Sequence, residues 1–539
     1  MNGRAPQAKG YSDAGASLTR RAQKGFVPNS GSPNEDINAN NSTLRQRARM
    51  LYMSSPVATS AINTNRTKVI GTGLTLKCTL DRELLGLTPE AAKAWQRRTE
   101  AEWNMWCRRE NCDALGMNGF LELQQLALRS WLMSGDVFVL LKREDRTPAN
   151  PYSLRLHLIE ADRISTPSGF RGGILDGSAT GGTVPEGQPG AGNRIYDGVE
   201  VDASGKVVAC YICDSYPQEL YRGDLTWTRV LVRGEKTGIP NILHIMDAER
   251  PDQYRGVSYL AQIIEPILQL RRYTESELMA ALVQSMFTAW IETETNTAEI
   301  PFEEVGTGDL SAAGNGFNLD GGSVADNVSD SENEYEMGPG SVFHLATGEK
   351  IVFGNPNIPT AGFETFVKTL CRLMGAALEL PYDVLIKEFG SSYSASRGAL
   401  LEAWEAVKMR RAWFVTDFCQ PVYEAWLAEA VALGRIKAPG YFDDPLLRTL
   451  WSEARWIGPV QGQLDPLKEI RAAIFAIDRG IKTHEQVTRE MGGGDWEENV
   501  EQLRRENELL TRAGGGTLSA TGLGPGGGDS GGEGSGDAE

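Results

Sequence analysis

The sequence predicts a fold of the α+β class. Three observations predict it: strand-like runs cluster between residues 137 and 213, long helical runs dominate the second half, and two helices bracket an acidic, glycine-containing insert. With 539 residues, 41% of them apolar and 23% charged, the chain is long enough for about three or four average domains, or for one elongated subunit.

The first 250 residues carry the expected strands. Residues 1–40 lack periodicity and contain Gly, Ser, Pro and Asn clusters, so we expect a flexible N-terminal arm. A helical pattern begins at Asn41, and Thr88-Pro89-Glu90 supplies a cap, a proline at the first helical position and an acid for a later helix. Alternating apolar residues predict strands at 69–76, 137–142, 154–159 and 207–213.

The middle of the chain predicts a rod. Apolar residues recur at helical spacing over residues 258–290, where Pro266 marks a kink or a restart. A straight helix from Pro266 onward would be about 38 Å long at 1.5 Å per residue, which is long for a compact domain. A second helix is expected over residues 362–380, ending before Pro381. Because these helices bracket residues 292–353, we expect a helical hairpin that carries a small head.

The last third of the chain is mostly helical in pattern. Residues 382–396 lack a helical period and are rich in Gly and Ser, so we expect a mobile loop there. The longest amphipathic run follows over residues 397–433, bent at Pro421. Capped helices are expected within residues 434–500, and residues 501–539 are expected to form a disordered acidic, glycine-rich tail.

The charge balance excludes one function class. Against 54 basic residues stand 71 acidic ones, a net charge of −17. A protein that grips nucleic acid over a broad surface normally has the opposite sign, because phosphate contacts need Lys and Arg. A protein that handles DNA without gripping it is not excluded.

No run reaches the roughly 18 apolar residues of a membrane span, and no signal-peptide pattern opens the chain, so we expect a soluble protein made in a cytoplasm.

The enzyme motifs are weak. Cys210 and Cys213 form a CxxC inside a strand pattern, where residues three apart point to opposite faces and do not easily share one metal or one disulfide. Cys107 and Cys112 lack a second ligand pair for zinc. No phosphate-binding loop GxxxxGK[ST] occurs. We therefore expect no metal, no cofactor and no catalytic residue, and a thiol or metal enzyme using Cys210 and Cys213 stays as an alternative.

Short segments spread over residues 41–500 carry a family resemblance. They are Val69-Ile70-Gly71-Thr72-Gly73-Leu74, Gly135-Asp136-Val137-Phe138-Val139, Leu158-Ile159-Glu160-Ala161-Asp162-Arg163-Ile164, Arg255-Gly256-Val257-Ser258-Tyr259-Leu260, Leu380-Pro381-Tyr382-Asp383-Val384-Leu385, Tyr393-Ser394-Ala395-Ser396-Arg397 and Trp456-Ile457-Gly458-Pro459. In their order the chain resembles the portal proteins of tailed phages, within the lambda-like branch.

The resemblance implies a portal fold assembled as a ring, usually of twelve subunits, through which double-stranded DNA enters and leaves a capsid. Its parts would be an α/β wing (41–250 with the long helix 397–433), a two-helix stem (251–291 and 355–381), a small mixed clip (292–354), a tunnel loop (382–396) and a helical crown (434–500).

The same resemblance implies partners and contact residues. Partners would be copies of the chain, DNA bound without sequence specificity, the terminase large subunit, the major capsid protein and scaffold, and a head-tail connector, with the virion as the location and the host cytoplasm during assembly. No membrane, cofactor or enzymatic activity is expected. The candidate contact residues are Lys387, Glu388, Gly390, Ser391, Ser392 and Tyr393 in the tunnel loop, Arg271 and Arg272 in the stem, and Asp326, Asp330, Glu332 and Glu334 in the clip.

Two other interpretations of the sequence remain open. Arg271, Arg272 and Lys387 could be exposed charges that only aid solubility. The acidic insert could instead make the chain a protein-binding adaptor or scaffold, without a ring and without a channel.

Overall fold

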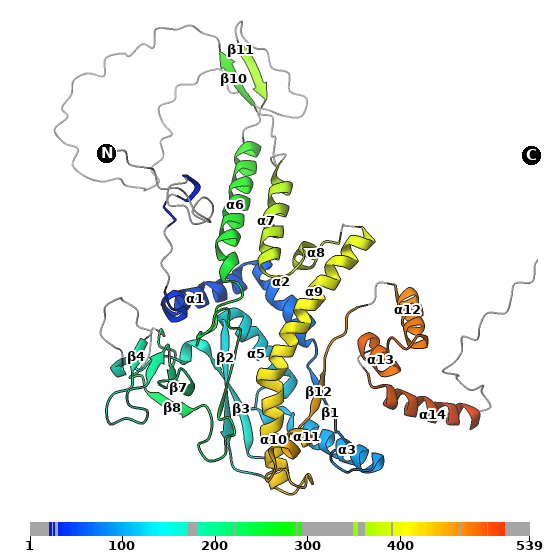
Figure 1. The fold of residues 1–539 in the computed structure, drawn as a ribbon. Coiled ribbons are helices and arrows are strands. Elements are labelled where there is room, and N and C mark those ends of the chain that lie inside the picture. The colour runs from blue at the N-terminus through cyan, green and yellow to red at the C-terminus, as the bar shows by residue number, and fades with distance from the viewer. Residues whose placement is uncertain are drawn as a thin grey trace, which may run out of the picture. The chain divides into compact units, whose positions relative to one another are not determined.

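The computed structural model describes eleven stretches of the chain: residues 21–23, 25–26, 31–170, 181–219, 223–286, 289–293, 349–353, 362–389, 392–462, 465–492 and 494–512. The chain divides into two compact units, one formed by Met1–Ile267 with Lys368–Glu539, and the other by Leu268–Val367. Helices and antiparallel sheets occupy separate stretches (Figure 1), so the predicted α+β class is confirmed.

The N-terminal part of the larger unit is helical. It contains α1 (Ala39–Ser54), α2 (Pro56–Asn65), α3 (Pro89–Trp106), α4 (Arg109–Cys112) and α5 (Phe120–Ser134). The predicted cap of α3 is confirmed, because the Thr88 hydroxyl accepts a hydrogen bond from the Ala91 amide at 3.3 Å. The flexible arm was expected to end at residue 40. Instead a π-helical turn, Asn34–Asn38, leads into α1, and Asp36 is tied to Arg250 by an ion pair of 2.6 Å.

Two sheets form the core of the strand region. One has the order β3-β2-β9, from β2 (Asp136–Arg143), β3 (Leu154–Glu160) and β9 (Ile242–Met246). The other has the order β4-β5-β6-β7-β8, from β4 (Gly181–Thr183), β5 (Arg194–Tyr196), β6 (Val199–Val201), β7 (Val207–Cys213) and β8 (Trp227–Leu231). Three of the four predicted strands are confirmed as β2, β3 and β7. The strand expected over residues 69–76 is mostly wrong, because residues 66–70 form a π-helical turn and β1 (Thr75–Cys78) begins only at Thr75. Phe138, Val199, Cys210 and Ile242 pack together in one buried cluster that joins the two sheets.

A second core is aromatic and links distant parts of the sequence. Trp103 of α3 lies 5.1 Å from Phe120 of α5, 5.5 Å from Tyr423 and 5.2 Å from Trp426, measured between ring centres and mostly in edge-to-face geometry. Tyr423 and Trp426 belong to α10 (Gln420–Ala432). Helices α3 and α5 and the last third of the chain therefore share one hydrophobic core.

The long amphipathic run is two helices. It comprises α9 (Tyr393–Phe414) and α10, joined by a π-helical segment, Val415–Cys419. The bend was expected at Pro421. That proline is the second residue of α10, and the departure from α-helical geometry is the π-helical segment directly before it, in a backbone that stays helical throughout.

The C-terminal region contains one strand that was not predicted. After α11 (Pro445–Trp451), β12 (Ala454–Ile457) pairs antiparallel with β1 (Thr75–Cys78), in a register that places Leu76 opposite Trp456. Three helices then follow, α12 (Pro466–Asp478), α13 (His484–Gly492) and α14 (Trp496–Arg512).

The expectation of a disordered tail from residue 501 is wrong for its first part, because α14 continues to Arg512. Arg504 pairs with Glu501 at 2.9 Å and with Glu508 at 2.8 Å, and such pairs three and four residues apart support a helix. Residues 513–539 lie outside the described residues.

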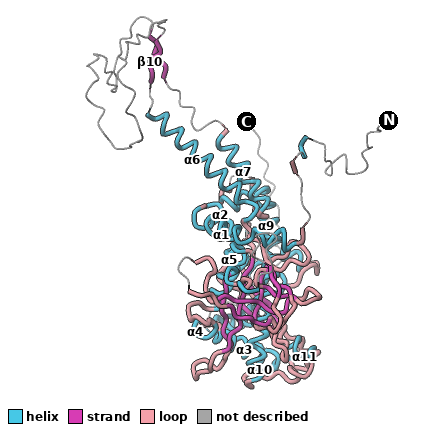
Figure 2. Tube along the Cα trace, turned by 90° about the vertical axis from the view of Figure 1, so that its left-hand side faces the viewer, coloured by secondary structure: helices cyan, strands magenta, loops and turns pink. Residues whose placement is uncertain are grey.

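Two long helices run side by side (Figure 2), α6 (Ile264–Met286) and α7 (Phe363–Ala377), and the smaller unit contains most of α6 and the beginning of α7. Tyr273 of α6 lies 5.4 Å from the ring of Phe363 and 4.8 Å from that of Phe366. The expected hairpin is confirmed, with α6 shorter than predicted. Trp290 lies in β10 (Ala289–Thr293), which pairs antiparallel with β11 (Glu349–Phe353). Pro266 lies in the first turn of α6, which begins at Ile264 directly after a 3-10 turn, Ala261–Ile263, so the expected restart near Pro266 is confirmed.

A buried ion pair joins the sheets to the segment before α6. Asp136, the first residue of β2, and Arg255 are both fully buried, with Arg255 Nε donating to Asp136 Oδ2 at 2.7 Å. The same guanidinium donates to the carbonyls of Ala161 and Ile164 at 2.8 and 3.0 Å, and Arg45 of α1 approaches Asp136 at 3.5 Å. Burial opposes the charge on Asp136, but Arg255 and Arg45 outweigh burial and hold its pKa well below the usual range.

Two glycines allow the backbones around this ion pair to meet. Gly135 has a φ of 89° and ends α5. A Cβ on Gly256 would lie 1.9 Å from the Gly135 carbonyl oxygen, closer than atoms can approach. Any other residue at position 256 would therefore push the segment before α6 away from the sheet.

We predict that Arg255→Met destabilises the larger unit by about 3–5 kcal/mol, because it leaves the buried Asp136 carboxylate without its main partner. Urea unfolding followed by tryptophan fluorescence measures the change. The matched control is Arg250→Met, which removes an exposed Arg–Asp pair worth about 0–1 kcal/mol. Adding Asp136→Asn to Arg255→Met should recover part of the loss, and equal effects of the two Arg variants would refute the role of this ion pair.

Candidate functional site

The segment expected to be a mobile loop, residues 382–396, is helical at both ends. It begins with α8 (Tyr382–Ile386), and α9 starts at Tyr393, so only residues 387–392 connect the helices. Ser392 caps α9 by accepting a hydrogen bond from the Ala395 amide at 3.4 Å. Gly390 and Ser391 lie outside the described residues. The predicted loop was too long. The five residues directly after Pro381 form a helix that is too short to show a helical period in the sequence.

The connection itself presents charged and apolar side chains to solvent. Lys387 ends α8 in the left-handed conformation, with a φ of 63°, and within the described residues it forms no ion pair. Glu388 accepts a hydrogen bond from the Tyr382 hydroxyl at 2.7 Å and lies 3.6 Å from Lys368 Nζ. The Tyr382 hydrogen bond and the Lys368 charge lower the pKa of Glu388. Phe389 is 60% exposed.

A buried arginine anchors the turn between α7 and α8. Arg410, near the C-terminal end of α9, donates to Asn65 Oδ1 at 3.1 Å and to Glu379 Oε2 at 2.5 Å, and its guanidinium lies 4.9 Å from the ring centre of Tyr259. The Tyr259 hydroxyl in turn donates to the Leu378 carbonyl. These contacts join α2, the segment before α6, the α7–α8 turn and α9, and so fix where the connection begins.

The sequence contained a signal for Arg410 that pattern reasoning missed. Arg410 follows Val407 by three residues and precedes Phe414 by four, so it lies on the buried face of its helix. A charged residue on such a face indicates a buried partner.

Arg271 and Arg272, the predicted stem residues, are both exposed on α6. Arg271 Nε pairs with Glu275 Oε1 at 2.8 Å within the helix. Tyr273 faces α7, and successive helical residues turn by about 100°, so Arg271 lies on the side of α6 away from α7. Part of its charge is already balanced by Glu275.

The predicted clip residues Asp326, Asp330, Glu332 and Glu334 lie outside the described residues. Only the strands that flank the insert, β10 and β11, are described. They bring the two ends of the insert together through an antiparallel pair in which Ile291 lies opposite Ile351.

The two cysteines of the CxxC motif are buried thiols. Cys210 and Cys213 are free and buried on β7. Burial raises the pKa of Cys210 to about 12 and also raises that of Cys213. Among the described residues, no three His, Cys, Asp or Glu side chains are placed to hold a metal ion. No described helix is both long and apolar enough to cross a membrane.

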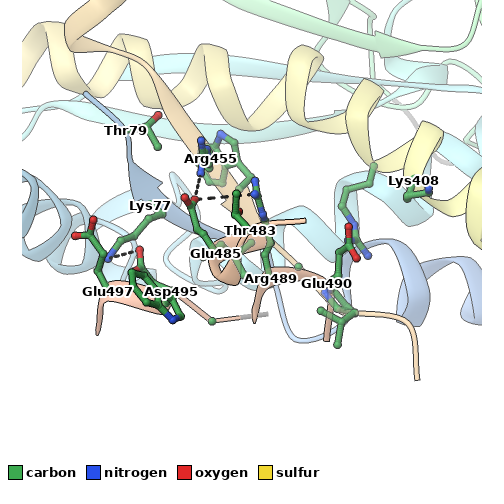
Figure 3. A pocket seen from close by; sticks show the side chains of 18 of the residues that line it. Lys77, Thr79, Lys408, Arg455, Thr483, Glu485, Arg489, Glu490, Asp495 and Glu497 are labelled. Carbon is green, nitrogen blue, oxygen red and sulfur yellow. Dashed lines mark hydrogen bonds and ion pairs between the residues drawn. The ribbon is translucent and has the colours of Figure 1, made fainter. Parts of the chain in front are cut away.

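A cavity of about 1210 Å³ lies between the β1–β12 ribbon, α9 and the α13–α14 pair. Figure 3 shows charged side chains of both signs around it, including Lys77, Arg455 and Glu485. Arg455 pairs with Glu485 at 2.5 Å, and Lys77 lies 3.9 Å from Asp495. Opposite charges pair across this cavity, so ion pairs join the elements that line it.

Comparison with known proteins places these features in a family. The model of the lambda family of phage portal proteins matches residues 19–411. The portal protein of Escherichia phage N15 is 24% identical over 91% of this chain and 88% of its own length. Portal protein B of Escherichia phage lambda is 23% identical over 87% and 84%, and the probable portal protein of Halomonas phage phiHAP-1 is 23% identical over 86% and 80%.

Solved structures are more distant. The neck of a native GTA particle computed with C12 symmetry matches with a TM-score of 0.40 and 12% identity, over 85% of this chain and 94% of that one. The virion of a native gene transfer agent particle gives a TM-score of 0.37 and 13% identity, over 84% and 92%. Because the family model spans well over half of the sequence, this chain belongs to the lambda family of phage portal proteins.

Proposed function

We propose that copies of this chain assemble into a ring, of twelve subunits by analogy with the family, whose axial channel passes double-stranded DNA into and out of a capsid. Family membership over residues 19–411 is the observation that carries this proposal. As a portal protein the chain is a structural, virion-associated protein. In the proposal it is made in the host cytoplasm, acts without enzymatic activity of its own, and takes no cofactor.

The described elements fit the parts that such a ring needs. The α6–α7 hairpin, stacked through Tyr273 and Phe363, suits a stem, and the β10–β11 pair suits the base of a clip. The two sheets and α9–α10 would form the wing. The crown would begin after β12 rather than at residue 434, because β12 is paired with β1 of the wing.

The charge distribution supports passage rather than tight binding. Each copy carries a net charge of −17, so the assembled body on balance repels DNA. A few basic side chains per copy can still touch phosphates transiently, and few contacts keep DNA mobile because each neutralised phosphate strengthens binding. We propose Arg271, Arg272 and Lys387 for these contacts, with Glu388, Gly390, Ser391, Ser392 and Tyr393 forming the rest of a collar anchored by Arg410.

The proposed protein partners follow from the parts. The clip, with Asp326, Asp330, Glu332 and Glu334, would meet the large subunit of terminase during packaging and a head-tail connector afterwards. The wing would meet the major capsid protein and the scaffold.

We predict that the purified full-length chain forms rings with a central hole. Negative-stain electron microscopy at several protein concentrations tests this directly. The adaptor alternative requires monomers or small oligomers without a hole, so a monodisperse monomer under all assembly conditions would contradict the proposal.

We predict that Lys387→Asn reduces the fraction of heads that retain DNA after packaging, because it removes a positive charge while asparagine tolerates the left-handed backbone. Deleting residues 390 and 391 should reduce retention further by shortening the collar. Counting filled heads by electron microscopy gives the readout. The control is Lys236→Asn, an exposed lysine on another loop. Retention equal to wild type in both loop variants would rule out the collar.

We predict that the seven cysteines react slowly with a thiol reagent in the native protein at pH 8. Burial raises the pKa of Cys78, Cys112 and Cys210 to about 12, and only the thiolate attacks the reagent. Titration should find less than about one fast-reacting thiol per native chain. In urea all seven thiols should react fast. Two fast thiols that disappear in a Cys210→Ser, Cys213→Ser variant would instead support the redox alternative.

A further inference from the structure

A pocket of about 580 Å³ opens between the turn that joins α1 to α2 and the end of α8, and we call it the α2 pocket. Its lining includes Ser55, Val57 and Lys387. Among the described residues that line it, Lys387 is the only charged side chain, so no carboxylate faces the pocket. The larger cavity beside β12 differs, because Glu485 and Asp495 balance its cations. In a chain with 71 acidic residues, a pocket whose wall carries a lysine and no acid favours an anion.

The N-terminus of α2 lies at this pocket, and α2 is a helix of ten residues. Pro56 opens the helix and has no N–H. The Thr59 N–H donates to the Ser55 carbonyl at 3.0 Å. The Val57 N–H precedes this bond and has no partner within the helix. The positive end of the helix dipole and a free amide therefore lie at the pocket, which is the arrangement with which helices bind phosphate.

Ser55 is an independent sign of a ligand. Its backbone is extended, with a φ of −114°, as at the cap position of a helix, but its hydroxyl makes no capping hydrogen bond. Ser55 is only 9% exposed, and its hydroxyl forms no hydrogen bond with any described residue. A hydroxyl that is largely removed from water and has no partner costs free energy. A ligand oxygen that accepts a hydrogen bond from Ser55 would recover it.

Helix α8 brings Lys387 to the same pocket. The Ser60 hydroxyl of α2 donates to the Leu385 carbonyl at 2.7 Å and so fastens the end of α8 beside α2. Lys387 ends α8 with a φ of 63°, and its side chain lines the pocket. The next residue, Glu388, is engaged elsewhere, by the Tyr382 hydroxyl at 2.7 Å and by Lys368 at 3.6 Å. The one acid beside Lys387 in the sequence therefore does not line the α2 pocket.

We propose that the α2 pocket binds a phosphate group. The Val57 amide and the Ser55 hydroxyl donate to phosphate oxygens, and the Lys387 ammonium supplies the opposite charge. Hydrogen bonds to an ionised group are about twice as strong as neutral ones, and lysine binds phosphate as a compact point charge. Free phosphate and the backbone of DNA share this chemistry. The assignment of DNA as the source, and only that assignment, rests on the proposed function.

Phosphorus NMR of inorganic phosphate, titrated with the full-length chain at constant ionic strength in chloride, tests the pocket. We expect the wild-type chain to broaden the phosphate resonance. Lys387→Asn and Ser55→Asp should each weaken phosphate binding roughly tenfold or more, the first by removing the charge and the second by filling the site with a carboxylate. Because aspartate is a favoured cap residue, Ser55→Asp should melt no lower than the wild type.

The controls are Lys236→Asn and Ser204→Ala, which change exposed residues on other turns and should leave phosphate binding at the wild-type level. A short DNA duplex then replaces inorganic phosphate, and fluorescence anisotropy follows its binding. We expect both site variants to weaken duplex binding and to lower its salt dependence, because a phosphate contact is lost. Duplex binding equal to wild type, with phosphate binding reduced, would overturn DNA as the source and make free phosphate the ligand.

Other results separate the pocket from the proposed function. No broadening with the wild-type chain, or equal broadening in both site variants, would refute the pocket, since the Ser55 hydroxyl is then satisfied by water alone. Rings in the microscope alongside that result would leave the proposed function intact. Loss of phosphate binding in both site variants of a chain that forms no rings would keep the pocket and refute the proposed function.

Discussion

The buried ion pair between Asp136 and Arg255 is the constraint on which the larger unit depends. It joins the first residue of β2 to the segment that leads into α6. Burial alone would make both charges unfavourable, so the arrangement is stable only because Arg45, two backbone carbonyls and His244 complete the hydrogen bonding. Burial lowers the pKa of His244 against the pull of Asp136, so the imidazole stays neutral near pH 7 beside two arginines. The start of the hairpin helix is therefore held by directional contacts as well as by apolar packing.

The sequence predicted the elements whose signals lie within a few neighbouring residues, and it did not predict pairings between distant residues. The cap at Thr88 and the strand over residues 207–213 were predicted because capping chemistry and side-chain alternation lie within a few residues. The pairing of β12 with β1 was not predicted, because it joins residues 76 and 456 and depends on contacts that no local pattern encodes. The end of α6 was placed too late because Trp290 continues the apolar run, although β10 needs it as a strand residue.

The candidate site was predicted less completely than the fold. Lys387 was identified by its charge in a segment without helical period, and the structure describes it at a helix end with a left-handed backbone. Arg410 was missed, because its partners Asn65, Tyr259 and Glu379 are distant in sequence and meet only in the fold. Charge and composition therefore indicate which exposed residues are available for contact, whereas the residues that hold them in place become visible only when the segments are packed together.

A portal must hold its copies together while leaving DNA free to move, and the charges of this chain suit that requirement. The net charge of −17 per copy opposes adhesion of DNA to the body, and Arg271 is already paired with Glu275. The affinity of assembled protein for double-stranded DNA, measured as a function of salt concentration, tests this claim most directly. Weak binding with a shallow dependence of log K on log salt is expected, because the slope counts the phosphates that are neutralised. Tight binding with a slope of about −10, typical of a protein that grips DNA over many phosphates, would contradict it.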